Sequence, residues 1–144
     1  MVIGYATGVF DLFHYGHVRL LHNAKQMCDK LVVGVTTDDL VSYKGKEPVI
    51  TFDHRIEVVR GCRYVDVAIP QDNMDKITTM KKLNASILFV GDDWYDSDKW
   101  ADYERSLHEM GAKVIYFPYT KSISSTKINQ ILDMRRHALR NHDE

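Results

Sequence analysis

The sequence predicts a single α/β domain over residues 1–144, with a five-stranded parallel sheet and helices on both faces. Two observations lead to this prediction. Short, continuously apolar and β-branched segments alternate with longer segments of helical periodicity, which is typical of parallel strands connected by helices. The length of 144 residues and the hydrophobic fraction of 44% fit one domain with a core of ordinary size.

The individual elements follow from the same pattern. Short apolar runs predict strands at Val2–Ala6, Lys30–Thr36, Val65–Ile69, Ser86–Val90 and Lys113–Phe117. The segments between and after them predict helices at Tyr15–Cys28, His54–Gly61, Met74–Leu83, Trp100–Met110 and Thr126–Leu139. Asp53 is the expected N-cap of the second helix, and Gly111 is the expected stop of the fourth. This order indicates a Rossmann-like sheet, in which ligands bind beyond the carboxyl ends of the strands.

The segment Gly8–His17, which joins the first predicted strand to the first predicted helix, carries the strongest functional signal. A helix N-terminus offers free N–H groups and a favourable dipole to an anion. His14 and His17 have i,i+3 spacing and can face such an anion from one side of the first turn. Gly16 lets the backbone approach a ligand closely. The H-x-G-H pattern therefore indicates chemistry on nucleotide phosphates, although histidines at this spacing also occur as surface or capping residues.

Three further segments carry residues that suit phosphate or polyol recognition. Lys44 and Lys46 flank a glycine in a loop, where they can reach a triphosphate or form a solvated basic turn. The segment Gly91–Trp94 follows the fourth strand, and its acids and aromatic ring suit a polyol, a base or an exposed turn. A second strand-to-helix turn can hold phosphate oxygens or simply cap the last helix, and it consists of Tyr119, Thr120, Lys121, Ser122, Ile123, Ser124, Ser125 and Thr126.

Composition excludes several classes of function. The net charge is −1 and no basic cluster stands out, so we expect no nucleic-acid partner. The apolar runs are of strand length and the N-terminus has no basic, apolar leader, so we expect no membrane span and no signal peptide. Cys28 and Cys62 match neither a metal site nor a disulfide framework, and they indicate buried thiols in a cytoplasmic protein.

Together these segments resemble the small cytidylyltransferases of the nucleotidyltransferase superfamily. The resemblance extends from Gly8 to Ile131 and rests on two signatures: G-V-F-D-L-F-H-Y-G-H at residues 8–17, and I-S-S-T at residues 123–126. Two positions depart from the second signature of the family. Tyr119 replaces a frequent arginine and Ser122 replaces a glycine, so Lys121 becomes the expected source of positive charge beside the nucleotide.

The resemblance implies that a cytidylyl group passes from CTP to a phosphorylated small alcohol, above all glycerol 3-phosphate, with release of pyrophosphate. It implies a homodimer, and Mg²⁺ that is carried by the phosphates rather than by a metal site of the protein. The expected catalytic residues are His14, His17, Lys44 and Lys46. The expected nucleotide-binding residues are Val9, Phe10, Asp11, Tyr15, Gly16, Gly91, Asp92, Asp93 and each residue from Tyr119 to Thr126. The expected acceptor-binding residues are Lys44, Arg55, Arg63, Lys76 and Trp94.

Three alternatives remain open from the sequence. The H-x-G-H pattern serves adenylyl and cytidylyl transfer alike. Phosphocholine or phosphoethanolamine could be the acceptor if Trp94, Tyr95, Trp100 and Tyr103 form an aromatic cage for a quaternary ammonium, although packing on a helix face is the preferred interpretation of these rings. The chain could also be a catalytically silent nucleotide-binding module, with Tyr119 and Ser122 as the marks of lost activity.

Overall fold

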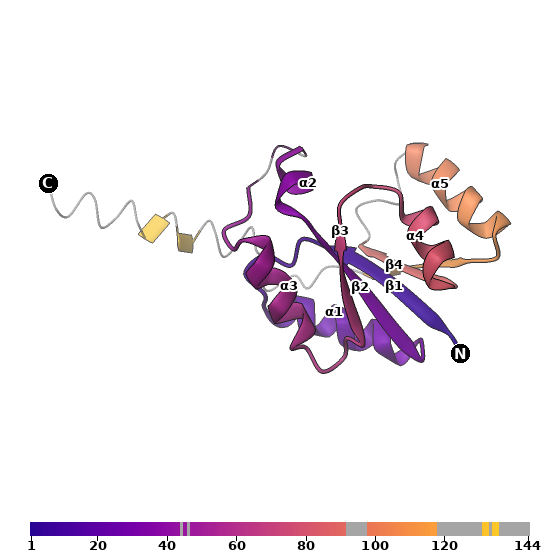
Figure 1. Cartoon of the computed structure of the whole chain (residues 1–144), viewed down its shortest axis with the longest axis horizontal. Coiled ribbons are helices and arrows are strands. Elements are labelled where there is room, and N and C mark those ends of the chain that lie inside the picture. Colours follow the sequence, from indigo (N-terminus) through magenta and orange to yellow (C-terminus); the bar gives the residue numbers. More distant parts are fainter. Residues whose placement is uncertain (44, 46, 92–97, 118–130, 133, 136–144) are drawn as a thin grey trace, which may run out of the picture.

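A five-stranded parallel sheet forms the centre of the molecule (Figure 1). The computed structural model describes residues 1–43, 45, 47–91, 98–117, 131–132 and 134–135. Its strands are β1 (Ile3–Gly8), β2 (Lys30–Thr36), β3 (Val67–Gln71), β4 (Ile87–Gly91) and β5 (Lys113–Phe117). They pair in the order β3-β2-β1-β4-β5, so β1 lies at the centre and β3 and β5 lie at the edges. The predicted fold class is confirmed.

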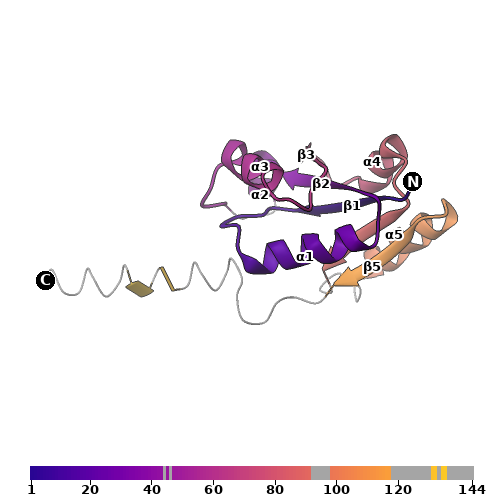
Figure 2. The ribbon, with the colours of Figure 1, turned by 90° about the horizontal axis from the view of Figure 1, so that it is seen from below.

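Helices cover both faces of this sheet. They are α1 (Tyr15–Gln26), α2 (Asp38–Tyr43), α3 (Phe52–Arg60), α4 (Lys76–Leu83) and α5 (Asp98–Glu109). One core cluster joins residues of α1 and α3 to one face of the sheet, and a second joins residues of α4 and α5 to the other face. Figure 2 shows α1 running along the length of β1. None of the helices in the described ranges combines the length and hydropathy that a bilayer crossing requires.

The side chains of β2 alternate between these two clusters. Val33 and Val35 belong to the cluster under α1 and α3, whereas Val32 belongs to the cluster under α4 and α5. Gly34 shares the second face, and a Cβ atom there would lie 2.5 Å from the Tyr5 hydroxyl oxygen. Close packing across the sheet therefore requires glycine at this position.

Several predicted boundaries are corrected by the structure. The strand predicted at Val2–Ala6 begins one residue later and ends two residues later, and the strand predicted at Val65–Ile69 begins and ends two residues later. The second predicted helix begins at Phe52, so Thr51 rather than Asp53 is its N-cap. The sequence also gave no prediction of α2, a helix of six residues. Of the predicted final helix Thr126–Leu139, the structure describes only residues 131–132 and 134–135.

Three residues characterise the end of α5 and the last part of β3. Gly111 follows α5 with φ +82°, as expected for a glycine that ends a helix. Pro70 lies within β3, which is possible because β3 is an edge strand and needs no donor on its outer side. Gln71 ends β3 and is fixed to β2, since its side-chain oxygen accepts a bond from the Thr36 hydroxyl at 2.8 Å.

Candidate functional site

The β1–α1 turn (residues 9–14) lies at the carboxyl end of the central strand. Gly8 ends β1 beside Val35 of β2, and α1 begins at Tyr15. The helix N-terminus therefore opens at the edge of the sheet where ligands bind in parallel α/β folds. Phe10 and Leu12 adopt φ values of +54° and +50°, which residues with side chains rarely adopt. Such backbone strain is typical of a turn whose shape serves a function.

His14 and His17 form a reciprocal cap at the start of α1. The backbone N–H of Gly16 donates to His14 Nδ1 at 3.0 Å, and the backbone N–H of His14 donates to His17 Nδ1 at 3.2 Å. The two rings stack with centroids 4.0 Å apart. A nitrogen that accepts a backbone N–H carries no proton, so each neutral ring carries its proton on Nε2. A capping role and a functional role of the two histidines are thus compatible, because capping uses Nδ1 of each ring and leaves Nε2–H as the donor.

Both histidines are held in the neutral state. Burial and, to a smaller extent, the neighbouring His14 lower the pKa of His17 to about 4, while the Asp11 carboxylate acts in the opposite direction. Burial also lowers the pKa of His14. At neutral pH the pair therefore offers two uncharged Nε2–H donors rather than two cations. Neutral donors beside a helix N-terminus suit a phosphate group whose negative charge increases during reaction.

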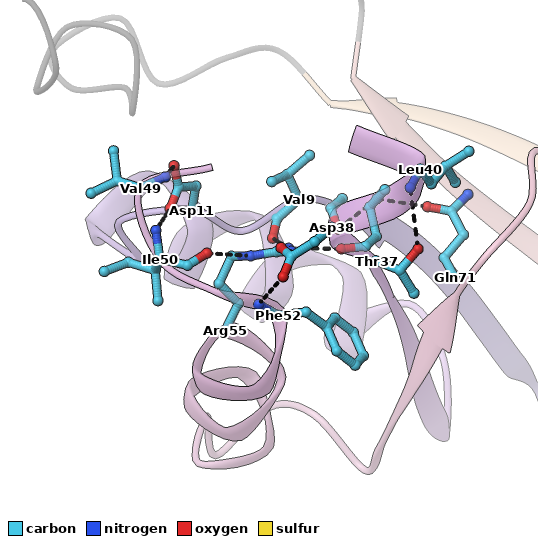
Figure 3. A network of polar contacts seen from close by, with 12 residues as sticks. Val9, Asp11, Thr37, Asp38, Leu40, Val49, Ile50, Phe52, Arg55 and Gln71 are labelled. Carbon is cyan, nitrogen blue, oxygen red and sulfur yellow. Dashed lines mark hydrogen bonds and ion pairs between the residues drawn. The ribbon is translucent and has the colours of Figure 1, made fainter. Parts of the chain in front are cut away.

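A network of hydrogen bonds around Asp11 and Arg55 fixes the β1–α1 turn to neighbouring segments (Figure 3). The two carboxylate oxygens of Asp11 accept the backbone N–H groups of Val49 and Ile50 at 2.8 and 2.9 Å. The Arg55 guanidinium donates to the carbonyls of Val9, Thr36 and Ile50 at 2.7–2.8 Å, and to Asp38 Oδ1 at 2.7 Å. Its side chain is 0% exposed. The structure therefore corrects the expectation for Arg55, because its donors are directed into the protein rather than toward an acceptor.

Asp38, the charged partner of Arg55, is not among the site residues expected from the sequence. Its carboxylate also accepts the Phe52 N–H at 3.0 Å, which lowers the Asp38 pKa together with the bond from Arg55. The available signal was its place two residues after the strand Lys30–Thr36, at the ligand-binding edge.

The remaining turn residues take different places. Phe10 is buried in the core, with its ring centroid 5.4 Å from that of His17. Tyr15 is 60% exposed at the first position of α1. Gly16 and Val9 act through their backbones, as donor to His14 and acceptor from Arg55. Val9 and Phe10 thus belong to the turn and Tyr15 and Gly16 to the first positions of α1, where the Tyr15 ring is largely open to solvent.

Arg63 lies away from the two histidines within one chain. It is exposed between the end of α3 and the start of β3, at the amino edge of the sheet. Its guanidinium lies 5.7 Å from the centroid of Tyr64, and that ring packs against His22 in the second half of α1. Within a single copy of the fold, Arg63 is therefore not placed to bind an acceptor beside His14, contrary to the expectation.

Lys76 begins α4 at the carboxyl edge and is only 7% exposed. Its ammonium nitrogen lies 5.6 Å from the ring centroid of Trp100, which belongs to the core. Tyr103 stacks on Trp100 at 5.3 Å, and the Trp100 indole N–H donates to the Tyr116 hydroxyl at 2.6 Å. Trp100 and Tyr103 therefore serve packing, and a lysine of the chain occupies the cation site on Trp100.

A pocket of about 550 Å³ opens between the β1–α1 turn and α3. Its lining is mostly apolar, and one wall is formed by His14, so a ligand in it would lie beside the cap of α1. This pocket could not be predicted from local sequence, because the turn and α3 are well separated along the chain. The lining residues are Phe10, Leu12, Phe13, His14, Ile50, His54, Arg55 and Val58.

Several expected site residues lie outside the described residues: Lys44, Lys46, Asp92, Asp93, Trp94 and each residue from Tyr119 to Thr126, as does Tyr95 of the suggested cage. Gly91 ends β4 and pairs with Phe117 of β5. The carboxyl end of β4 therefore lies beside that of β5. The chain continues from these two strand ends into the segments that contain residues 92–95 and 119–126, whereas Lys44 and Lys46 follow α2. Within the described part of the chain, no three His, Cys, Asp or Glu residues form a group that could hold a metal ion.

Several known proteins are similar to this chain in sequence or in fold. The model of the cytidylyltransferase-like family matches residues 5–131. The glycerol-3-phosphate cytidylyltransferase of Bacillus subtilis (strain 168) is 37% identical over 85% of this chain and 91% of its own length. The FAD synthase of Archaeoglobus profundus is 32% identical over all of this chain and 95% of its own length. The crystal structure of the lipopolysaccharide core biosynthesis protein of Thermoplasma volcanium GSS1 superposes with a TM-score of 0.69 at 28% identity, covering 84% of this chain and 98% of that one.

The family match covers nearly the whole fold, including the β1–α1 turn with its two capping histidines. The two relatives compared above by sequence are both nucleotidyltransferases, and each is matched over most of its length. The chain therefore belongs to the cytidylyltransferase-like family of nucleotidyltransferases.

Proposed function

We propose that this enzyme transfers a cytidylyl group from CTP to a phosphorylated small alcohol, and that the acceptor is glycerol 3-phosphate. The observation that carries the proposal is the reciprocal cap of His14 and His17, which presents two neutral Nε2–H donors at a helix N-terminus. This arrangement suits the α-phosphate of a nucleotide. The glycerol-3-phosphate cytidylyltransferase relative in Bacillus subtilis supports the choice of nucleotide and acceptor.

In the proposed reaction, a phosphate oxygen of the acceptor attacks the α-phosphorus of CTP. A new P–O bond forms there, the bond to the β-phosphate oxygen breaks, and pyrophosphate leaves with that electron pair. The attacking oxygen is already anionic at neutral pH, so no general base is required. The protein contributes positioning and charge stabilisation, as in other phosphoryl transfers. His14 and His17 would donate to the α-phosphate as its charge increases.

Residues outside the described part of the chain have further roles in the proposed reaction. Lys46 would contact the triphosphate, and Lys44 would contact the acceptor phosphate. The hydroxyls of residues 124–126 would hold the β- and γ-phosphates at the start of the final helix. Mg²⁺ would arrive bound to the triphosphate, because the cation needs few protein ligands when phosphates supply oxygens.

The surroundings of Trp100 favour a polyol phosphate over a quaternary ammonium acceptor. A choline group would have to compete with the Lys76 ammonium for the same ring face, against charge repulsion. Glycerol 3-phosphate offers hydroxyl groups instead, and these could donate hydrogen bonds to the carboxylates of Asp92 and Asp93. A site with such acceptors rejects analogues that lack the hydroxyls, since its buried polar groups then stay unpaired.

A second candidate function is the adenylyl transfer that produces FAD. It is favoured by the FAD synthase relative, whose identity of 32% over the whole chain is close to the 37% of the cytidylyltransferase. The mostly apolar pocket beside His14 also has room for a group larger than glycerol. In this case ATP would replace CTP and FMN would be the acceptor, while the roles of the histidines would stay the same.

The deciding experiment measures pyrophosphate release for four nucleoside triphosphates, each with glycerol 3-phosphate, phosphocholine, phosphoethanolamine or FMN. We expect CTP with glycerol 3-phosphate to give the highest kcat/KM. Phosphocholine should react far more slowly, and equal or faster turnover with it would refute the polyol assignment. A preference for ATP with FMN would establish the second candidate. Nucleotide binding without pyrophosphate release for any pair would indicate a silent binding module.

A further inference from the structure

We propose that Arg55 and Asp11 are positioning residues that hold the β1–α1 turn in the shape that the two histidines need. This inference rests on the proposed function of that turn in phosphate binding. Neither residue is proposed to act on the substrate directly, because Arg55 is buried with 0% exposure and the Asp11 carboxylate is directed to backbone amides.

The first argument is the closed circuit of hydrogen bonds around the turn. Arg55 donates to the carbonyl of Val9, at the start of the turn, and to the carbonyl of Ile50. The N–H of Ile50 donates in turn to Asp11, two residues after Val9. Both ends of the segment 9–11 are thus fixed to the same backbone unit, and Figure 3 shows the members of this circuit side by side.

The second argument is the strain that the circuit contains. Phe10 precedes Asp11 and Leu12 follows it, and both residues adopt left-handed φ values near +50°. Residues other than glycine leave this region unless their surroundings hold them there. The Asp11 carboxylate and the Val9 carbonyl are the two points at which the network holds this part of the chain.

The third argument is the position of the circuit between functional segments. Arg55 also bonds Thr36 at the end of β2 and Asp38 at the start of α2, so one side chain joins four stretches of the carboxyl edge. Val49 and Ile50 directly follow the segment that carries the two candidate lysines. His14 lies only three residues after Asp11, so a shift of the turn would move the cap of α1 and its Nε2–H donors.

The main test compares Arg55→Lys with Arg60→Lys, a matched control on the same helix whose side chain is half exposed. Lysine keeps the charge at position 55 but cannot reach four acceptors at once. We expect Arg55→Lys to lower kcat by about 10²-fold with little change in KM for the nucleotide, because misplacement of catalytic groups by about 1 Å has that effect. Arg60→Lys should behave as the wild type.

A readout that needs no substrate separates this inference from the proposed function. The ring ¹⁵N signals of His14 and His17 report which nitrogen is protonated. We expect them to shift in Arg55→Lys and to stay unchanged in Arg60→Lys. If the wild-type enzyme transfers no nucleotide at all, these signals still decide whether Arg55 positions the turn.

Two further variants keep the test decisive. Leu12→Gly removes the steric cost of the left-handed turn, so adding it to Arg55→Lys should restore activity by about tenfold.

If Arg55→Lys does not fold, Asp11→Asn is tested instead. This variant loses one of the two oxygens that accept backbone N–H groups, and we expect the same ring-signal shifts and at least about a tenfold loss of kcat. Unchanged ring signals, or a loss of activity that only matches the unfolded fraction, would overturn the inference.

Discussion

The pKa of His17 is the property of the site that can be measured most directly. An unperturbed histidine has a pKa near 6.5, and burial beside His14 lowers that of His17 to about 4. The difference of about 2.5 units changes the protonation equilibrium by roughly 300-fold. At pH 6, an ordinary histidine is about three-quarters protonated, whereas His17 should be about 1% protonated. Activity should therefore not fall between pH 7 and pH 5.5 through protonation of this ring.

The same pKa change affects stability, with a definite sign. The folded state disfavours the proton on His17, so the unfolded chain binds more protons between pH 6.5 and pH 4. The contribution of His17 to stability is complete above pH 6.5 and is lost as the pH falls toward 4. The loss amounts to at most about 3 kcal/mol, and to about 1–2 kcal/mol after allowance for the partial exposure of the ring.

The assay combines an NMR titration of the histidine rings with urea unfolding at pH 7 and pH 5. The His17 signal should remain that of a neutral ring protonated at Nε2 down to about pH 5. Removal of the ring in His17→Ala should reduce the difference in unfolding free energy between the two pH values. A His17 midpoint near 6.5, or an unchanged pH dependence in His17→Ala, would refute the assignment of a buried neutral donor.

The other predictions concern activity and packing. His14→Ala and His17→Ala should each lower kcat by ~10²–10³ with the fold intact, whereas His22→Ala, on the same helix but packed on Tyr64, should retain wild-type turnover. Near-normal rates in both site variants would exclude the proposed mechanism. Gly4→Ala should destabilise the fold by about 1–3 kcal/mol in urea unfolding, because its Cβ would lie 2.5 Å from the Phe89 ring. Gly61→Ala is the matched control, since its Cβ would meet no atom closer than 3.4 Å, and equal stability of the two variants would contradict the packing argument.

The sheet could be predicted from the sequence because its strands are short apolar segments between segments of helical periodicity. The predicted bounds Lys30–Thr36 and Lys113–Phe117 are the observed ones, since a continuous apolar run forms most of each segment. The predicted bounds of the edge strand β3 are two residues too early. The strand ends in Pro70 and Gln71, and these residue types are not favoured in strands. The structure shows that both fit there, with Gln71 bonded to Thr36.

The site was predictable in its local part only. The i,i+3 spacing of His14 and His17 determines their common face, and the structure places both at the cap of α1. Arg55 could not be assigned in the same way, because its partners are backbone carbonyls and Asp38, between 5 and 46 residues away. Local sequence shows a charged residue in the first turns of a helix. It does not show that tertiary contacts bury this residue and use four of its donors.

The proline in β3 has a consequence for association. In a strand, neighbouring residues direct their backbone groups to opposite sides, and the Gln71 carbonyl is directed to the β2 side, where it accepts the Thr37 N–H. Pro70 and Ala68 therefore face the open side. Pro70 has no N–H to offer there, and the Ala68 carbonyl already accepts a bond from Arg60 at 3.4 Å. This side of the sheet is poorly suited to extension by another strand, which protects the protein against edge-to-edge aggregation and directs any second copy to a different surface.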